Sequence, residues 1–182
     1  QTYAPKRVLG VIRPTVEVAV QMTQNGIIGV MATEGTVNSH AYYREIKHLN
    51  RNLQVIEKSA PLLVPLIEEG WHQKSVARTI LRKYLKPFKD YRLDIFILGC
   101  THYPLIESDI RRMMGKKVKV LSSTDCTVVK FREYLDRHPE ITKKLTLGGR
   151  LKFFTTDTPM RFVKGGEKFL GEPIEDITKI ML

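Results

Sequence analysis

Cysteine is scarce in this chain: Cys100 and Cys126 are the only two among its 182 residues. Two isolated cysteines fit neither the disulfide framework of a small secreted domain nor a zinc site with several thiolate ligands. They are typical of a protein from a reducing compartment, so we expect a cytoplasmic protein. We also expect neither a metal ion nor a cofactor.

Long apolar runs are also missing. The longest, such as residues 95–98 (IFIL), are far shorter than the roughly 20 residues that cross a bilayer. The polar start of the chain, residues 1–7, does not resemble a signal peptide. We therefore expect no membrane partner, and the composition of 42% hydrophobic and 27% charged residues is that of a globular protein.

Acidic residues are few, with 19 Asp and Glu against 30 Lys and Arg, which gives a formal charge of +11. Such an excess can indicate binding to nucleic acid. The densest basic groups, at 78–89, 111–119 and 143–152, lie among apolar residues at helix or strand spacing, so we interpret them as solvated faces. No helix-turn-helix, zinc finger or RNA-binding aromatic signature accompanies them, and we expect no nucleic-acid partner.

Short β-branched runs alternate with amphipathic stretches along the chain. The predicted strands are 8–12, 27–31, 53–59, 94–99, 118–121, 151–155 and 177–181. The predicted helices are 14–24, 36–49, 62–70, 75–88, 104–114, 124–137 and 159–170, and 138–150 is a predicted surface loop. This alternation indicates βαβ units, and hence an α/β fold with a parallel sheet.

Ligands of parallel sheets gather at the carboxyl ends of the strands. Three loops that follow predicted strands are therefore candidate sites, at residues 32–36, 100–104 and 122–124. Thr36 in the first loop has a second interpretation, as the N-cap of the helix that follows.

Cys100 has the most informative surroundings, because it follows a fully apolar strand and precedes a helix. This setting favours the thiolate and predicts a lowered pKa for the thiol. His102 is near enough to hold or donate a proton, and Thr101 supplies a hydroxyl beside loop amides that could hold a carboxylate. Gly99 would let a ligand approach the backbone. A buried structural cysteine is the alternative, and Cys100 and His102 alone do not decide between the two.

The full string at residues 98–105, LGCTHYPL, closely resembles the second catalytic-cysteine motif of glutamate racemases. Aspartate racemases, which are related, usually carry an acidic residue where this chain has His102. Residues 10–14 (GVIRP) and 28–37 (IGVMATEGTV) resemble two further segments of that family, and so do 65–70, 153–157 and 169–171. We interpret Glu68 and Glu69, in the segment 65–70, as structural.

The resemblance implies a three-layer α/β/α fold with two similar domains. Residues 1–121 would form the complete middle domain, and 122–182 the C-terminal part of a second, split domain. The implied activity is cofactor-independent interconversion of L- and D-glutamate by two bases, which supplies D-glutamate for peptidoglycan. Cys100 would be one base with His102 assisting it, and Thr33, Thr36 and Thr101 would bind the substrate. A homodimer is possible.

The sequence also departs from the family. The Asp-Ser-Gly, Pro-Tyr-Gly and Cys-Asn-Thr motifs of its first third are not found here, so we expect the chain alone to be inactive. Ser122 stands where the family usually has Asp. Cys126 stands where it usually has Ala, and we interpret Cys126 as a core residue.

Two other functions stay open at this point. One is a basic, non-catalytic module that binds nucleic acid or another anionic partner, which salt-dependent retention on heparin would favour. The other is a racemase for a different acidic substrate such as aspartate, against which His102 and the extent of the resemblance argue.

Overall fold

The computed structural model describes residues 8–146, 148 and 151–181. The chain forms two compact units, residues 1–137 and 138–182, which are described separately. The expected domain boundary after Leu121 stays a prediction, which this division into units does not test.

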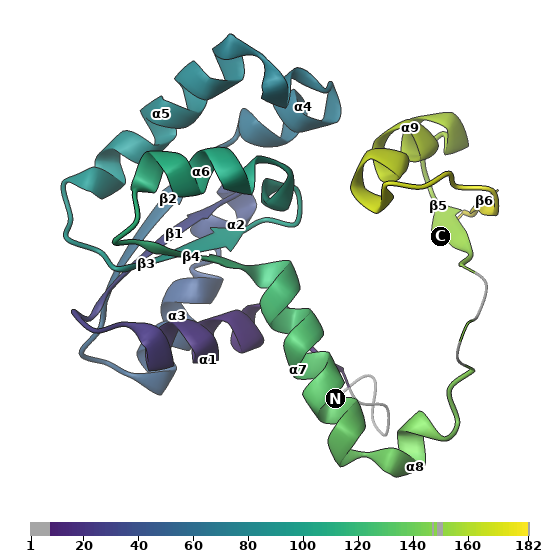
Figure 1. The fold of residues 1–182 in the computed structure, drawn as a ribbon, viewed down its shortest axis with the longest axis horizontal. Coiled ribbons are helices and arrows are strands. Elements are labelled where there is room, and N and C mark those ends of the chain that lie inside the picture. Colours follow the sequence, from purple (N-terminus) through teal and green to yellow (C-terminus); the bar gives the residue numbers. More distant parts are fainter. Residues whose placement is uncertain (1–7, 147, 149–150, 182) are drawn as a thin grey trace. The chain divides into compact units, whose positions relative to one another are not determined.

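The first unit is built on a four-stranded parallel sheet (Figure 1). Its strands are β1 (Ile27–Ala32), β2 (Gln54–Ser59), β3 (Ile95–Gly99) and β4 (Lys119–Ser122). They lie in the order β2-β1-β3-β4. The central strands β1 and β3 are almost continuously apolar because both of their faces are covered.

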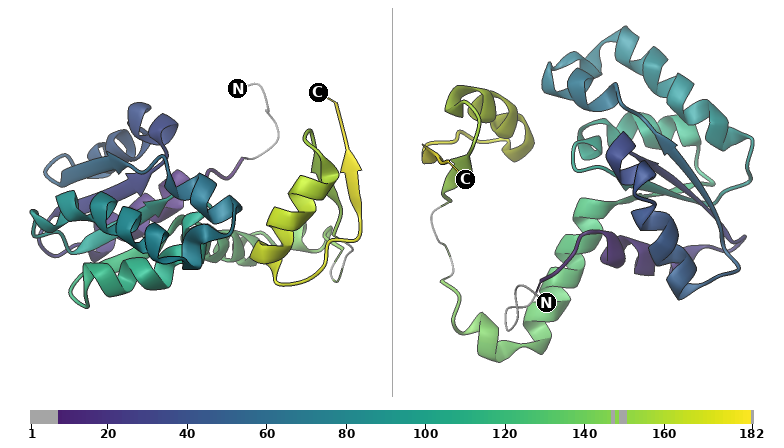
Figure 2. Two further views of the ribbon diagram at one scale, coloured as in Figure 1. Left: turned by 90° about the horizontal axis from the view of Figure 1, so that it is seen from above. Right: turned by 180° about the vertical axis from the view of Figure 1, so that it is seen from behind.

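Helices cover both faces of this sheet, as the views in Figures 1 and 2 show. One face carries α1 (Ile12–Met22) and α3 (Ala41–Leu49). The other carries α4 (Leu63–Glu68), α5 (Ser75–Lys89) and α6 (Glu107–Met114). Helix α7 (Ser123–Arg137) follows β4 and packs on α1. The predicted α/β fold with a parallel sheet is confirmed.

The alternation of side chains along β3 divides the core in two. Phe96 and Leu98 pack under α4, α5 and α6, whereas Ile95 and Ile97 pack against α1 and α3. The ring of Phe96 meets that of Phe88 edge to face, with the centroids 4.8 Å apart. Such a pair is held both by buried apolar area and by the favourable ring geometry.

The second unit contains α8 (Pro139–Thr142), β5 (Phe153–Thr155), α9 (Pro159–Leu170) and β6 (Ile177–Lys179). Strands β5 and β6 pair in parallel, and α9 connects them as a βαβ unit. The predicted loop 138–150 contains α8, and its residues 147, 149 and 150 lie outside the described part of the chain.

One predicted strand is wrong. No strand forms at 8–12: Val8 is 76% exposed and α1 already begins at Ile12. Within the described residues this apolar run has no neighbouring strand to complete its hydrogen bonds, so its composition does not make it a strand.

The single helix predicted at 36–49 is two helices, α2 (Glu34–Asn38) and α3. The break falls at His40, which has a left-handed backbone with φ of 50°. The helix predicted at 104–114 likewise begins with a separate 3-10 turn, η2 (Tyr103–Ile106). Across residues 8–146, 148 and 151–181, no helix has the length and apolarity needed to cross a membrane.

Candidate functional site

The parallel register brings the two most informative loops together. Ala32 at the end of β1 is paired with Gly99 at the end of β3. Thr33 and Cys100 are the next residues of each strand, so both emerge at the same edge of the sheet from strands about 4.8 Å apart. The carboxyl edge therefore carries the cysteine beside the threonine-bearing loop.

Cys100 is half-buried at this edge, and its Sγ lies 3.9 Å from Nδ1 of His102. Burial raises the pKa of the Cys100 thiol, and the backbone amides of His102 and Tyr103 that face the sulfur lower it by less. The expectation of a lowered pKa is therefore wrong. Burial destabilises the thiolate by removing its hydration, and this effect is larger than the stabilisation by the loop amides.

Glu68 on α4 completes a row of three side chains. Its Oε1 lies 3.2 Å from Nε2 of His102, whose other ring nitrogen faces Cys100. A carboxylate that accepts the Nε2–H leaves Nδ1 as the acceptor for the thiol proton. In this arrangement the imidazole can draw a proton from Cys100 while Glu68 fixes the orientation of the ring.

Replacing Glu68 by glutamine is expected to slow alkylation of Cys100 by iodoacetamide. One hydrogen bond is worth about 0.5–1.5 kcal/mol, so the rate near neutral pH should fall about two- to tenfold. The rate should also need a higher pH to reach half its maximum, because the ring holds the thiol proton less well. The measurement is made in a Cys126→Ala background, in which Cys100 is the one thiol left.

Glu69→Gln is the matched control, since Glu69 is the exposed neighbour of Glu68. It should leave both the rate and its pH profile unchanged. An equal effect of the two substitutions would show that Glu68 does not act through His102.

The threonine loop is held by its own hydroxyls. Thr33 Oγ1 and Thr36 Oγ1 share a hydrogen bond of 2.9 Å. Thr33 is the N-cap residue of α2, so the interpretation of Thr36 as an N-cap is wrong. Thr101 is exposed beside Cys100. The candidate residues Cys100, His102, Thr33, Thr36 and Thr101 thus all lie at the carboxyl edge.

Gly99 is required for packing, whereas the sequence suggested that it admits a ligand. A Cβ at Gly99 would lie 2.9 Å from Cβ of Ala32 and 3.0 Å from Cε2 of Tyr42. Burial raises the pKa of Tyr42 to about 12, and its side chain is hydrogen-bonded to Ser123 at the start of α7. The end of β3 is therefore closely packed between β1 and the buried Tyr42 ring.

The third predicted loop has a structural role. Ser122 is buried, and its Oγ accepts a hydrogen bond of 3.3 Å from the backbone N–H of Asp125. It therefore satisfies an amide in the first turn of α7. Cys126 is buried one residue further along, which confirms its interpretation as a core residue.

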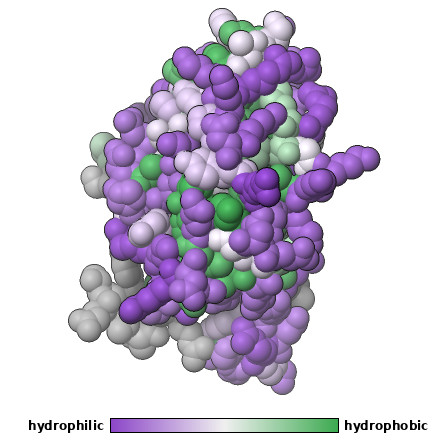
Figure 3. Space-filling model, turned by 90° about the vertical axis from the view of Figure 1, so that its left-hand side faces the viewer, coloured by the Kyte–Doolittle hydropathy of each residue, from purple (hydrophilic) through white to green (hydrophobic). Residues whose placement is uncertain are grey.

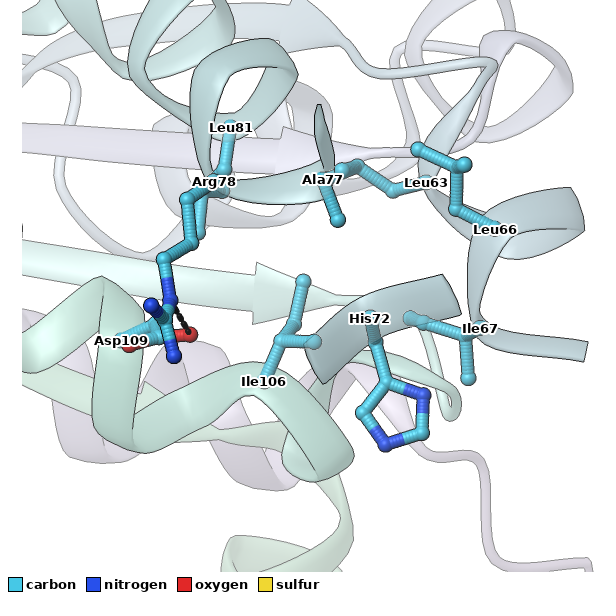
Figure 4. A pocket seen from close by; sticks show the side chains of 9 residues that line it. All are labelled: Leu63, Leu66, Ile67, His72, Ala77, Arg78, Leu81, Ile106 and Asp109. Atoms are coloured by element: carbon cyan, nitrogen blue, oxygen red, sulfur yellow. Dashed lines mark ion pairs between the residues drawn. The ribbon is translucent and has the colours of Figure 1, made fainter. Parts of the chain in front are cut away.

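A small cavity lies between α4, α5 and α6 (Figure 4). Its volume of about 10 Å³ has room for a single water molecule. Leu63, Ile67, Leu81 and Ile106 line it, and an ion pair of 3.8 Å between Arg78 and Asp109 lies at one side. A cavity this small cannot hold an amino acid.

The chain is similar to known proteins over most of its length. The family model described as Asp/Glu/Hydantoin racemase matches residues 1–131. A glutamate racemase of Geobacter metallireducens is 37% identical over 175 residues, which are 96% of this chain. The chain belongs to the glutamate racemase family.

A glutamate racemase of Syntrophus aciditrophicus is 32% identical over the whole of this chain and 67% of its own length. The solved structure of a glutamate racemase isoform from Bacillus anthracis matches 100% of this chain and 67% of its own, with a TM-score of 0.86 and 31% identity. A Francisella tularensis glutamate racemase, solved in complex with D-glutamate, matches 94% of this chain and 62% of its own with a TM-score of 0.82 and 29% identity. The Geobacter relative is covered over 64% of its length, so the chain spans about two thirds of these proteins.

The sequence analysis interpreted Glu68 as structural, whereas the structure places its carboxylate in contact with His102 at the candidate site. None of the three candidate loops was the segment that follows β2. That segment also starts at the carboxyl edge and leads into α4, which carries Glu68. Its position after a strand of the parallel sheet was the signal for a place at the carboxyl edge.

Proposed function

We propose that the Cys100 loop forms one half of a glutamate racemase site, which would act without a cofactor on the α-carbon of glutamate. The observation that carries this proposal is the placement of the Glu68–His102–Cys100 row beside the Thr33 loop. The row offers proton transfer, and the threonine hydroxyls and loop amides offer hydrogen bonds to carboxylates.

Racemisation requires two bases on opposite faces of the α-carbon. A thiolate on one face removes the α-proton and becomes a thiol, and a thiol on the other face donates its proton and becomes a thiolate. The raised pKa of Cys100 keeps it protonated at neutral pH, so it begins as the donor. To act as the acceptor it would first pass its proton to Nδ1 of His102, 3.9 Å away.

The second base would come from sequence equivalent to the first third of the relatives. Residues 1–121 would then be the complete middle domain, and 122–182 would add to a second domain shared with that first third. The two-stranded sheet of the second unit supports this proposal. Parallel sheets are normally buried on both faces, yet Phe154 on β5 is 57% exposed.

The test compares this chain with a fusion that supplies the first third of the Geobacter relative ahead of Gln1. Circular dichroism of an L-glutamate solution should stay constant with the chain alone and decay to zero with the fusion. Clear racemisation by the chain alone would contradict the need for a second, absent base. A folded fusion that binds D-glutamate but leaves the signal unchanged would refute the proposed activity.

The proposed activity also implies a role in the cell. A glutamate racemase in the cytoplasm would supply D-glutamate for the synthesis of peptidoglycan. The presence of D-glutamate in the Francisella structure is a property of that protein and makes the same substrate reasonable for this chain.

A further inference from the structure

The balance of charge differs between the two edges of the first unit. The carboxyl edge and its flanking helices carry the acidic residues Glu34, Glu57, Glu68 and Asp125 together with the basic residues Lys58 and Lys74. The basic excess is therefore not gathered where an anionic amino acid would bind. It lies mainly at the opposite, amino edge of the sheet.

Two of the three basic groups in the sequence meet at that amino edge. Strand β3 begins beside β4, because Ile95 is paired with Lys119. The backbone N–H of Lys119 donates a 2.8 Å hydrogen bond to the carbonyl of Asp94, which ties together the chain segments that enter the two strands. The C-terminal end of α5 leads into the first of these segments, and the C-terminal end of α6 leads into the second.

Six exposed basic side chains of these segments form what we call the basic edge. They are Lys86, Lys89, Arg92, Lys116, Lys117 and Lys119. Among the residues that the structure describes, none of the six takes part in an ion pair. The side of the molecule that holds the amino edge is mostly hydrophilic, with apolar areas near its centre and toward its top (Figure 3).

Two acidic residues nearby, Asp90 and Asp94, offset only part of the charge of the six basic residues. Asp94 accepts hydrogen bonds from Thr23 Oγ1 and from the backbone amides of Gln24 and Asn25. Its carboxylate is thus engaged in holding the turn before β1. Asp90 is the remaining acidic residue in the segment between α5 and β3.

We propose that the basic edge binds single-stranded nucleic acid through its phosphates. Tyr91 is 39% exposed between Lys89 and Arg92, so an aromatic side chain is accessible among the cations. Proteins that bind single strands without sequence preference usually combine positive charges along the phosphate backbone with aromatic side chains on which bases stack. Tyr91 is the one large apolar side chain exposed between the residues of the basic edge. A lipid membrane would therefore find little apolar surface here to insert.

This proposal departs from the expectation drawn from the sequence, in which each basic group was a separate solvated face. The reason is tertiary: the register of β3 and β4 places the segments next to each other. The basic edge is at the other end of the strands from Cys100, so the proposal does not depend on the racemase function.

The test uses the whole chain and a fluorescently labelled single-stranded DNA oligonucleotide, with binding followed by anisotropy at increasing salt. Six phosphate contacts predict a slope of about −4 in a plot of log K against log salt, from about −0.7 for each contact. The triple variant Lys89→Glu, Lys116→Glu, Lys117→Glu should weaken binding at least tenfold. Tyr91→Ala should weaken it about tenfold through the loss of stacking.

The matched control is Lys143→Glu, Lys144→Glu, Lys152→Glu, which changes the net charge equally on exposed residues of the second unit. It should leave the dissociation constant within twofold, as should Cys100→Ser. Equal weakening by both triple variants would overturn the proposal, because binding would then follow net charge alone. So would no binding at low salt, or binding to phosphatidylserine vesicles with none to the oligonucleotide. Circular dichroism confirms that each variant is folded.

Discussion

Racemisation by the completed fusion is expected to fall about a thousandfold when Cys100 is replaced by serine. General acid–base groups contribute about a hundred- to ten-thousandfold, and a serine hydroxyl is far too weak an acid to replace a thiol. The Sγ of Cys100 lies 3.9 Å from His102 and next to the Thr33 loop, so no other described thiol is placed to take its part. Circular dichroism of either glutamate enantiomer measures the loss.

Cys126→Ser is the matched control, because it makes the same change at the other cysteine. Cys126 is buried in the first turns of α7 and faces away from solvent, so the fusion should keep its rate within a few fold. An active Cys100→Ser fusion would remove Cys100 from the mechanism. A large loss in the control alone would point to Cys126 as the base.

The second large effect is on stability. Phe96→Ala is expected to lower the free energy of unfolding by about 3–5 kcal/mol, the usual cost of removing a buried phenyl ring. Phe96 is fully buried on β3, pairs edge to face with Phe88 and fills the space beside Gly29. Urea denaturation followed by circular dichroism gives the difference from the shift in midpoint.

Phe131→Ala removes the same atoms from a side chain that is 46% exposed on α7. Exposed positions usually change stability by less than about 0.5 kcal/mol. A similar small shift for both variants would mean that the core around β3 is not packed as the structure has it.

Buried strands followed from the sequence more closely than the chain's start and its helix boundaries did. The buried runs that became β1 and β3 were predicted almost to the residue, because strands covered on both faces must be apolar throughout. The run at 8–12 looked equally apolar and failed, since a strand also needs a neighbour to pair with, and local composition does not reveal one. His40 interrupted a predicted helix through its backbone conformation alone.

The candidate site shows the same division. The string around Cys100 identified the loop, and the position of that loop after an apolar strand indicated the carboxyl edge. The pKa of the thiol was predicted in the wrong direction, because the extent of burial depends on side chains that pack over the loop from elsewhere in the chain. Glu68 lies 34 residues before His102, and the contact between them exists only after β2 and β3 take their places in one sheet.

The sequence by itself determined the class of fold, the family and the loop that carries the cysteine, because apolar periodicity and short motifs lie within short stretches of the chain. The tertiary structure alone decided that Glu68 orients His102, that burial raises the pKa of Cys100 and that two basic segments share one edge. The physical reason is that charge, hydration and hydrogen bonding act through space over a few ångströms, whereas the groups concerned are tens of residues apart along the chain.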